Sequence, residues 1–110
     1  MQKTSLTALA RHELEAASRA PSGRSAKTIY GGHEHQLRQT LIALRAGRSL
    51  GEYENPGEGT LQVIVGRVLL RCGGDSWSGW NADVIVLPPA PHSVEAVEDA
   101  VVLLTVVKSR

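Results

Sequence analysis

The chain has 110 residues, of which 42% are hydrophobic, and this size and composition predict one compact domain with a single core. Its 12 Lys and Arg residues nearly balance its 11 Asp and Glu residues and are scattered along the chain, which argues against a nucleic-acid partner. The single cysteine, Cys72, excludes an internal disulfide, and no apolar run is long enough to form a signal-peptide core or to span a bilayer. We therefore expect a cytoplasmic protein with no membrane partner.

The first element expected along the chain is a short amphipathic helix over residues 5–20, where apolar side chains recur at helical spacing. Thr4 or Ser5 is available as its N-cap, and Pro21 begins a stop signal. Because the apolar stripe is thin, we expect the helix to dock on a sheet or on a neighbouring subunit. Residues 1–32 then form this helix and a connecting arm, and residues 33–110 form the main domain.

The rest of the chain is typical of short β-strands separated by turns. Because the chain has no Phe, Leu, Val, Ile and Ala must fill the interior, which favours strands packed through β-branched side chains. Many short strands at near-regular spacing predict an all-β sandwich or barrel. The expected strands cover residues 37–44, 60–65, 67–72, 83–87, 92–97 and 100–107.

Two longer motifs resemble those of the cupin superfamily, and the resemblance covers residues 37–107. Residues 61–68 (LQVIVGRV) fit the end of the first cupin motif, and residues 82–92 (ADVIVLPPAPH) fit the second, in which a hydrophobic strand leads through a proline-rich loop to a histidine. Ala82 stands where the family usually has Gly, and the loop before the histidine is one residue short. The resemblance implies an all-β double-stranded β-helix, the cupin jelly-roll barrel, with a short N-terminal helix.

Residues 54–58 and 101–106 narrow the resemblance to a group of small single-domain bacterial cupins, which carries no particular reaction with it.

Two turns follow from the residues alone. Pro88 and Pro89 cannot donate ladder hydrogen bonds, so they should end a strand and hold His92 at the start of the next one, near a barrel mouth. Gly66 lies between two strand-like runs and should allow a tight reversal that pairs them.

The usual cupin metal site is largely missing. The resemblance implies two histidines and a glutamate in the first motif, at the positions of Tyr53, Asn55 and Gly59, and a final histidine at His92; only His92 matches. We therefore expect no tightly bound metal. Tyr53 and Asn55 can line a polar ligand pocket with His92, with Gln62 reaching in from the adjacent strand. Alternatively, His92 braces the barrel mouth by a hydrogen bond, and Tyr53 and Asn55 satisfy backbone groups of the turn.

Two alternative metal ligand sets remain. Glu52 and Glu54 should point away from the face of Tyr53, but Glu58 lies next to the lost carboxylate position and would be a weak ligand after a register shift. His33 and His35 would face the same side of an extended chain and could hold a divalent metal together with His92.

The residues of the segment 75–81 are expected to form a loop in which Trp77 and Trp80 cap the barrel or contact a second subunit.

Three functions remain open on the sequence. The first is a cupin that binds a small molecule through Tyr53, Asn55, Gln62 and His92. The second is a small enzyme, an isomerase, lyase or dioxygenase-like protein that uses His92 as acid/base or as metal ligand. The third is a scaffold that serves only for dimerisation; the resemblance implies homodimers paired through sheet edges.

Overall fold

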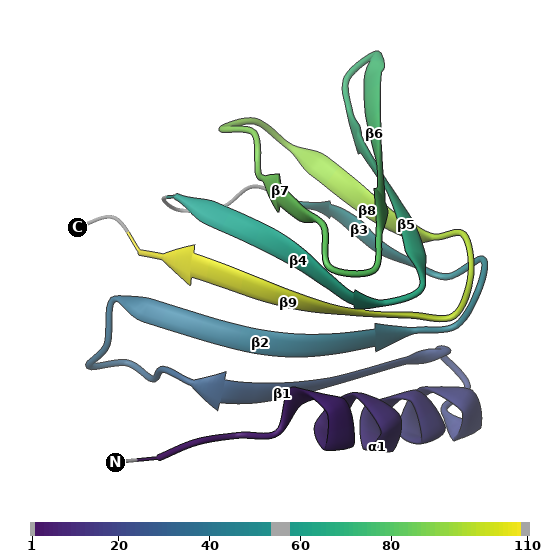
Figure 1. Cartoon of the computed structure of the whole chain (residues 1–110). Helices are drawn as coiled ribbons and strands as arrows, with labels where there is room; N and C mark the ends of the chain where they lie inside the picture. Colours follow the sequence, from purple (N-terminus) through teal and green to yellow (C-terminus); the bar gives the residue numbers. More distant parts are fainter. Residues whose placement is uncertain (1, 54–57, 109–110) are drawn as a thin grey trace.

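Two antiparallel β-sheets face each other, and one helix covers the far side of the larger sheet (Figure 1). The computed structural model describes residues 2–53 and 58–108. The larger sheet has the strand order β1-β2-β9-β4-β7, and the smaller has the order β3-β8-β5-β6. The elements are α1 (Leu6–Arg19), β1 (Arg24–Tyr30), β2 (Leu37–Leu44), β3 (Ser49–Tyr53), β4 (Gly59–Val65), β5 (Arg67–Cys72), β6 (Asp75–Trp80), β7 (Val84–Val86), β8 (His92–Ala96) and β9 (Ala100–Val107).

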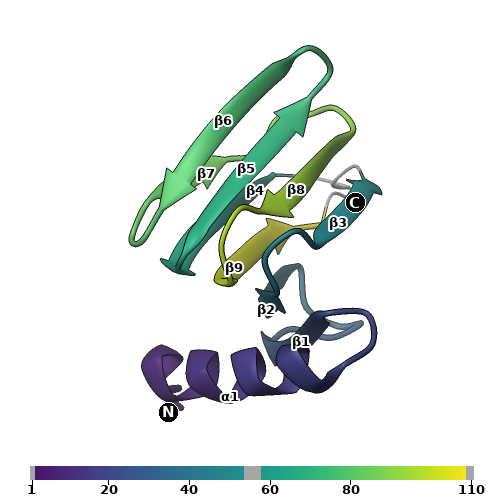
Figure 2. The same ribbon diagram turned by 90° about the vertical axis from the view of Figure 1, so that its right-hand side faces the viewer.

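The helix α1 docks on its own sheet. The Ser5 side chain caps it by accepting a hydrogen bond from the backbone N–H of Ala8. Ala10 and Ala17 are buried against β2 and β9, so the small side chains let the helix approach the sheet closely. Figures 1 and 2 show the helix lying along the five-stranded sheet, on the side away from the second sheet. The expected apolar stripe is therefore used within the chain. No helix in the described part of the chain is long and apolar enough to cross a membrane.

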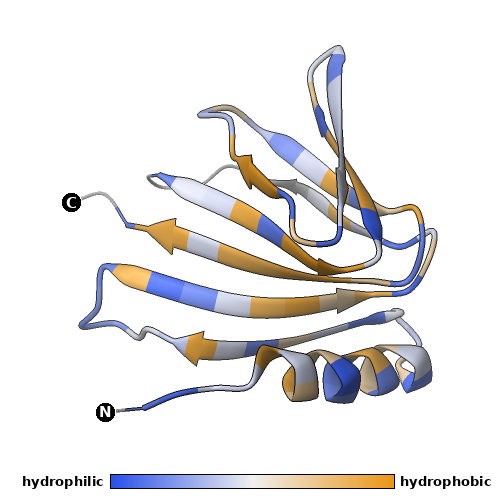
Figure 3. Ribbon diagram, viewed as in Figure 1, coloured by the Kyte–Doolittle hydropathy of each residue, from blue (hydrophilic) through white to orange (hydrophobic). Residues whose placement is uncertain are grey.

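The main core lies between the two sheets. Alternation along the strands sends every second side chain into this space, so that Leu61 and Val63 of β4 meet Val68 and Leu70 of β5. The strands β2 and β9 also carry apolar side chains on their other face, toward α1, and Figure 3 shows β9 as apolar along most of its length. The remaining core residues are Ile42, Leu44, Leu87, Val94, Ala96, Ala100 and Val102.

The all-β jelly roll expected from the sequence is confirmed, but three strands were not predicted. The strand β1 is exposed over most of its length, and β3 (SLGEY) contains few apolar residues, so both carry little hydrophobic signal. The segment expected to be a loop around Trp77 and Trp80 is instead the strand β6, paired with β5 over its whole length. Its serines and glycine are typical of turns, and only pairing with β5 makes them a strand.

The expected hairpin at Gly66 is also wrong. The chain before Gly66 pairs with β9 and β7, whereas the chain after it pairs with β6 and β8, so Gly66 carries the chain from one sheet to the other. Its φ of +90° is in the left-handed region, and its Cα faces the backbone of Asp99 and Ala100. Only glycine fits both conditions without strain.

Candidate functional site

His92 lies inside the fold, at the start of β8. The alternation of this short strand places His92, Val94 and Ala96 on its buried face, and the two residues between them on the half-buried outer face. His92 has no exposed surface, and its Nδ1 lies 2.9 Å from the carbonyl oxygen of Ala90. Because a carbonyl only accepts, Nδ1 carries the hydrogen in this bond. The expected bracing hydrogen bond is therefore present, and the imidazole faces the space between the sheets.

The backbone of Tyr53 pairs with that of His92. Tyr53 is the last residue of β3, and the ladder between β3 and β8 places the two residues opposite each other. The alignment that put Tyr53 at a cupin ligand position thus brings it next to the histidine of the second motif. Asn55 lies outside the described residues, as does Glu54, and the side chains of Glu52 and Tyr53 are not described either. The predicted role of Tyr53 and Asn55 in a pocket stays a prediction.

The structure does not bring Gln62 to His92. On β4, Leu61 and Val63 face the core between the sheets, so Gln62 lies on the opposite face. Its partner across the ladder is Leu103, whose side chain packs under α1. We expected Gln62 to reach into the cup, but it lies on the opposite face of β4. The sequence could not show which face it occupies, because the face depends on the pairing of β4 with β9.

Cys72 occupies a position that the sequence did not single out as part of a site. It ends β5 on the same face as Val68 and Leu70, packs against the core between the sheets, and is a free, half-buried thiol. The ladder pairs Arg71 with Ser93, and Cys72 and His92 are the residues that follow this pair along the two strands. In the sequence, Gly73-Gly74 marks the end of β5, but it does not show that β8 is the second neighbour of this strand.

The alternative metal ligands are not gathered into a site. His33 and Glu34 form a turn between β1 and β2 rather than part of a strand, so the His-x-His spacing no longer places both rings on one side. His35 packs instead against the ring of Tyr30, with ring centroids 5.0 Å apart. Glu58 is exposed in the segment before β4. Over residues 2–53 and 58–108, no three His, Cys, Asp or Glu side chains form a group that could hold a metal ion. The described side chains therefore do not supply the ligand set of the usual cupin metal.

The two tryptophans lie on opposite faces of β6. Trp80 faces outward, and the guanidinium of Arg67 stacks over its ring at 4.6 Å. Trp77 faces the side of β7 and lines a groove of about 400 Å³ between the two strands, together with Ser78, Asp83, Val84, Ile85, Val86 and Pro88. The indole of Trp77 thus lies at the lateral edge of the barrel, where the two sheets separate.

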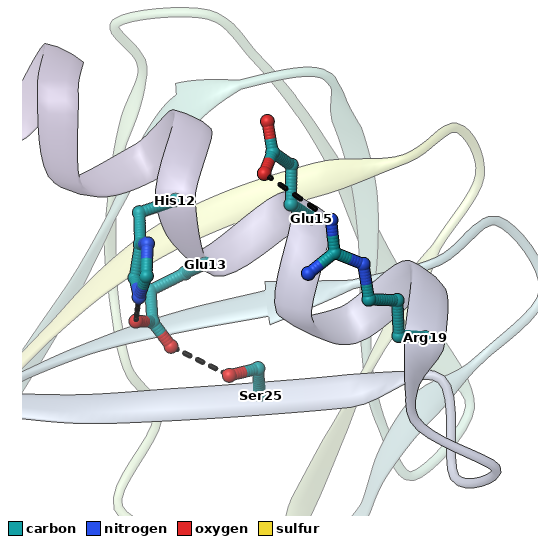
Figure 4. A network of polar contacts seen from close by, with 5 residues as sticks. All are labelled: His12, Glu13, Glu15, Arg19 and Ser25. Carbon is teal, nitrogen blue, oxygen red and sulfur yellow. Dashed lines mark hydrogen bonds and ion pairs between the residues drawn. The ribbon is translucent and has the colours of Figure 1, made fainter.

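A second buried polar group lies on the helix, on the other side of the larger sheet (Figure 4). Ser25 of β1 donates a hydrogen bond of 2.6 Å to Oε1 of Glu13, and Nε2 of His12 lies 3.9 Å from Oε2 of the same carboxylate. Glu13 is only 5% exposed, so the hydroxyl replaces part of its lost hydration. This contact fixes α1 to β1; it does not belong to the site at His92.

The fold is shared with many solved structures. No protein-family model matches the sequence, and no curated protein is significantly similar to it. The protein TT1209 from Thermus thermophilus superposes with a TM-score of 0.76 at 19% identity, over 99% of this chain and 100% of that one. A cupin superfamily protein from Desulfitobacterium hafniense gives a TM-score of 0.72 at 14% identity, over 78% of each chain. A salicylate 1,2-dioxygenase from Pseudaminobacter salicylatoxidans gives 0.73 at 19% identity, over 90% of this chain and 33% of the other.

Proposed function

Because this chain has the cupin fold, we propose that it binds a small molecule in the cup between its two sheets, beside His92, without a tightly held metal. The observation that carries the proposal is the placement of His92. It and Glu13 are the two buried polar or charged residues in the described part of the chain, and only His92 faces the space between the sheets. Buried polar groups are retained in apolar interiors where they make specific hydrogen bonds, and ligand sites combine an apolar lining with a few such groups.

The chemistry of the proposed site follows from how His92 is held. With Nδ1 held by the Ala90 carbonyl, the orientation of the ring is fixed. The proposed ligand is small and largely apolar, with one polar group that meets the imidazole. Leu70, Val94 and Leu87 supply apolar surface in the same core.

An enzyme is the second candidate, and the same side chain supports it. An imidazole held in a fixed orientation can act as acid or base toward a bound substrate, as in an isomerase or lyase. The shared fold with a dioxygenase does not favour oxidation here, since one fold hosts many reactions. A barrel that serves only as a scaffold is the third candidate.

The test uses untagged protein and two matched variants. His92→Asn keeps an amide donor near the position of Nδ1 but removes Nε2, whereas His92→Gln places its amide near the position of Nε2. Small alcohols, amines, acids and sugars are screened by thermal shift, and the metal content is measured by elemental analysis. We expect a compound that raises the Tm of the wild-type protein, has no effect on His92→Asn and retains a partial effect on His92→Gln.

Gln62→Ala serves as the control, because Gln62 lies on the outer face of β4 and its loss should leave the thermal shift unchanged. Stoichiometric metal that is lost in His92→Asn would replace the proposal with a metalloenzyme. If no compound raises the Tm of the folded wild-type protein, the scaffold function takes its place.

A further inference from the structure

The groove between β6 and β7 lies where the two sheets end on the same side of the barrel. The strand β6 is an edge of the smaller sheet, β7 is an edge of the larger one, and the turn between them carries the chain across (Figure 1). At Gly79 the sheets lie close together, because a Cβ there would lie 3.1 Å from Cδ1 of Ile85. Trp77, the preceding residue on the same face of β6, lines the groove of about 400 Å³. That volume suits a small molecule.

The indole of Trp77 is a half-exposed aromatic wall of this groove. Trp77 is paired with Leu70, whose side chain faces the core, so its indole lies on the inner face of β6, opposite to Trp80. The ring of Trp80 is already covered by the guanidinium of Arg67, whereas no cation of the described residues stacks on Trp77. Because indole is the side-chain ring that attracts a cation most strongly, Trp77 can accept one from a ligand.

Asp83 gives the groove a negative charge. Among the described residues that line the groove, it is the only charged one. Its Oδ2 accepts a hydrogen bond of 2.8 Å from the backbone N–H of Trp80, which fixes the carboxylate at the turn between β6 and β7. The ion pairs of residues 2–53 and 58–108 all join other side chains, so no Lys or Arg of these residues neutralises Asp83. The second oxygen, Oδ1, is therefore available to a hydrogen-bond donor of a ligand.

We propose that this groove is a second binding site, separate from the cup, and that it takes a small organic amine in its protonated form. The ammonium group lies between the indole of Trp77 and the carboxylate of Asp83, and the apolar part of the ligand packs on Ile85 and Pro88. The carboxylate attracts a cation and repels a carboxylic acid. Because it also accepts hydrogen bonds, the site favours an ammonium with N–H donors over a quaternary one.

The site does not rest on the function proposed for the cup. His92 is not among the residues that line the groove, and the groove lies at the side of the barrel rather than in the core between the sheets. Either site can therefore be lost without the other, and one variant at each site separates them.

The test compares phenethylamine with two probes of similar shape, the neutral phenethyl alcohol and the anionic phenylacetate. Binding is followed by fluorescence in a Trp80→Phe protein, because Trp77 is then its only tryptophan. We expect the amine to change the emission of Trp77 in a saturable way, with a dissociation constant in the millimolar range. The alcohol should bind about fivefold more weakly, and phenylacetate should leave the emission unchanged.

Asp83→Asn tests the carboxylate, because an amide oxygen still accepts the Trp80 N–H while the charge is lost. Asp75→Asn is the matched control, since it removes the same charge from an exposed residue of β6 that does not line the groove. We expect Asp83→Asn to weaken amine binding about fivefold or more and Asp75→Asn to leave it unchanged.

Circular dichroism verifies that each variant folds. If Trp80→Phe does not fold, the two indole N–H signals of the wild-type protein report the same titration by NMR, and only the signal of Trp77 should shift. If Asp83→Asn does not fold, the comparison of the three probes still tests the charge of the site.

The proposal is overturned if phenethylamine gives no saturable change, if the alcohol binds as well as the amine, or if Asp75→Asn weakens binding as much as Asp83→Asn. Amine binding that His92→Asn abolishes and Asp83→Asn leaves unchanged also overturns it, because the amine then lies in the cup, as the proposed function requires. Amine binding that Asp83→Asn weakens and His92→Asn leaves unchanged supports the groove, whatever the thermal-shift screen finds at His92.

Discussion

Replacing Gly66 with Ala should destabilise the fold strongly, because this residue carries the chain between the two sheets. Its φ of +90° costs a residue with a Cβ about 1–2 kcal/mol. The new methyl would also overlap the carbonyl oxygen of Asp99 and lie 2.9 Å from the Cα of Ala100. These are backbone atoms, so they cannot rotate away, and the crossing between the sheets must shift instead.

The expected loss is the sum of both effects. Forced repacking of this kind costs about 1–3 kcal/mol, so Gly66→Ala should lower the free energy of unfolding by about 2–5 kcal/mol. That is a large part of the roughly 5–15 kcal/mol that stabilises a typical domain. The backbone N–H of Gly66 also donates to the side-chain oxygen of Asn81 at 2.6 Å, and a shift of the turn weakens this bond.

Gly73→Ala is the matched control, since Gly73 has a φ of +58° and nothing lies within 4 Å of its would-be Cβ. It should lose only the backbone contribution of about 1–2 kcal/mol. Urea denaturation followed by far-UV circular dichroism measures both variants. The reasoning is refuted if Gly66→Ala is no less stable than Gly73→Ala.

Three further changes test the packing and the polar contacts. Ala82 adopts a φ of 71°, so Ala82→Gly should stabilise the protein by about 0.5–1 kcal/mol after the entropy of the more flexible unfolded chain is subtracted; a lower urea midpoint would contradict this. Ser25→Ala removes the hydroxyl that donates to the buried carboxylate of Glu13 and should cost about 1–3 kcal/mol in the same assay, whereas an unchanged midpoint would show that water replaces it. Leu70→Ala should lower the free energy of unfolding by about 2–5 kcal/mol, because the side chain has no exposed surface. Val97→Ala should lower it by less than about 0.5 kcal/mol, because Val97 is 47% exposed. Equal losses would contradict the assigned core.

Hydrophobic patterning was enough to predict the strands that form the core. The runs at β2, β4, β5 and β9 are rich in Leu, Val and Ile, and burial of these side chains between the sheets stabilises the fold. The edge strand β6 was not predicted, because its Ser and Gly residues adopt a strand conformation only through pairing with β5.

The site was predicted in part. The proline-rich loop does place His92 at the start of β8, with its ring inside the fold. The error at Gln62 came from the face of β4, which depends on pairing with a strand about 40 residues away in the chain. The relative position of Cys72 and His92 likewise depends on the pairing of β5 with β8, two strands that are far apart in the sequence.

The position of α1 has a consequence for how the chain finds its native alignment. With the second sheet on one side and the helix on the other, the adjoining parts of β2 and β9 are buried on both faces and lack an apolar-polar alternation. A slip of one residue would leave such a strand equally apolar, so burial by itself does not choose between the two alignments. The correct register is therefore selected by contacts at the ends of the strands, such as the 2.8 Å hydrogen bond from the Ala46 N–H to the carboxylate of Asp99. Weakening these contacts should therefore produce misaligned, self-associating chains and not merely a lower melting temperature.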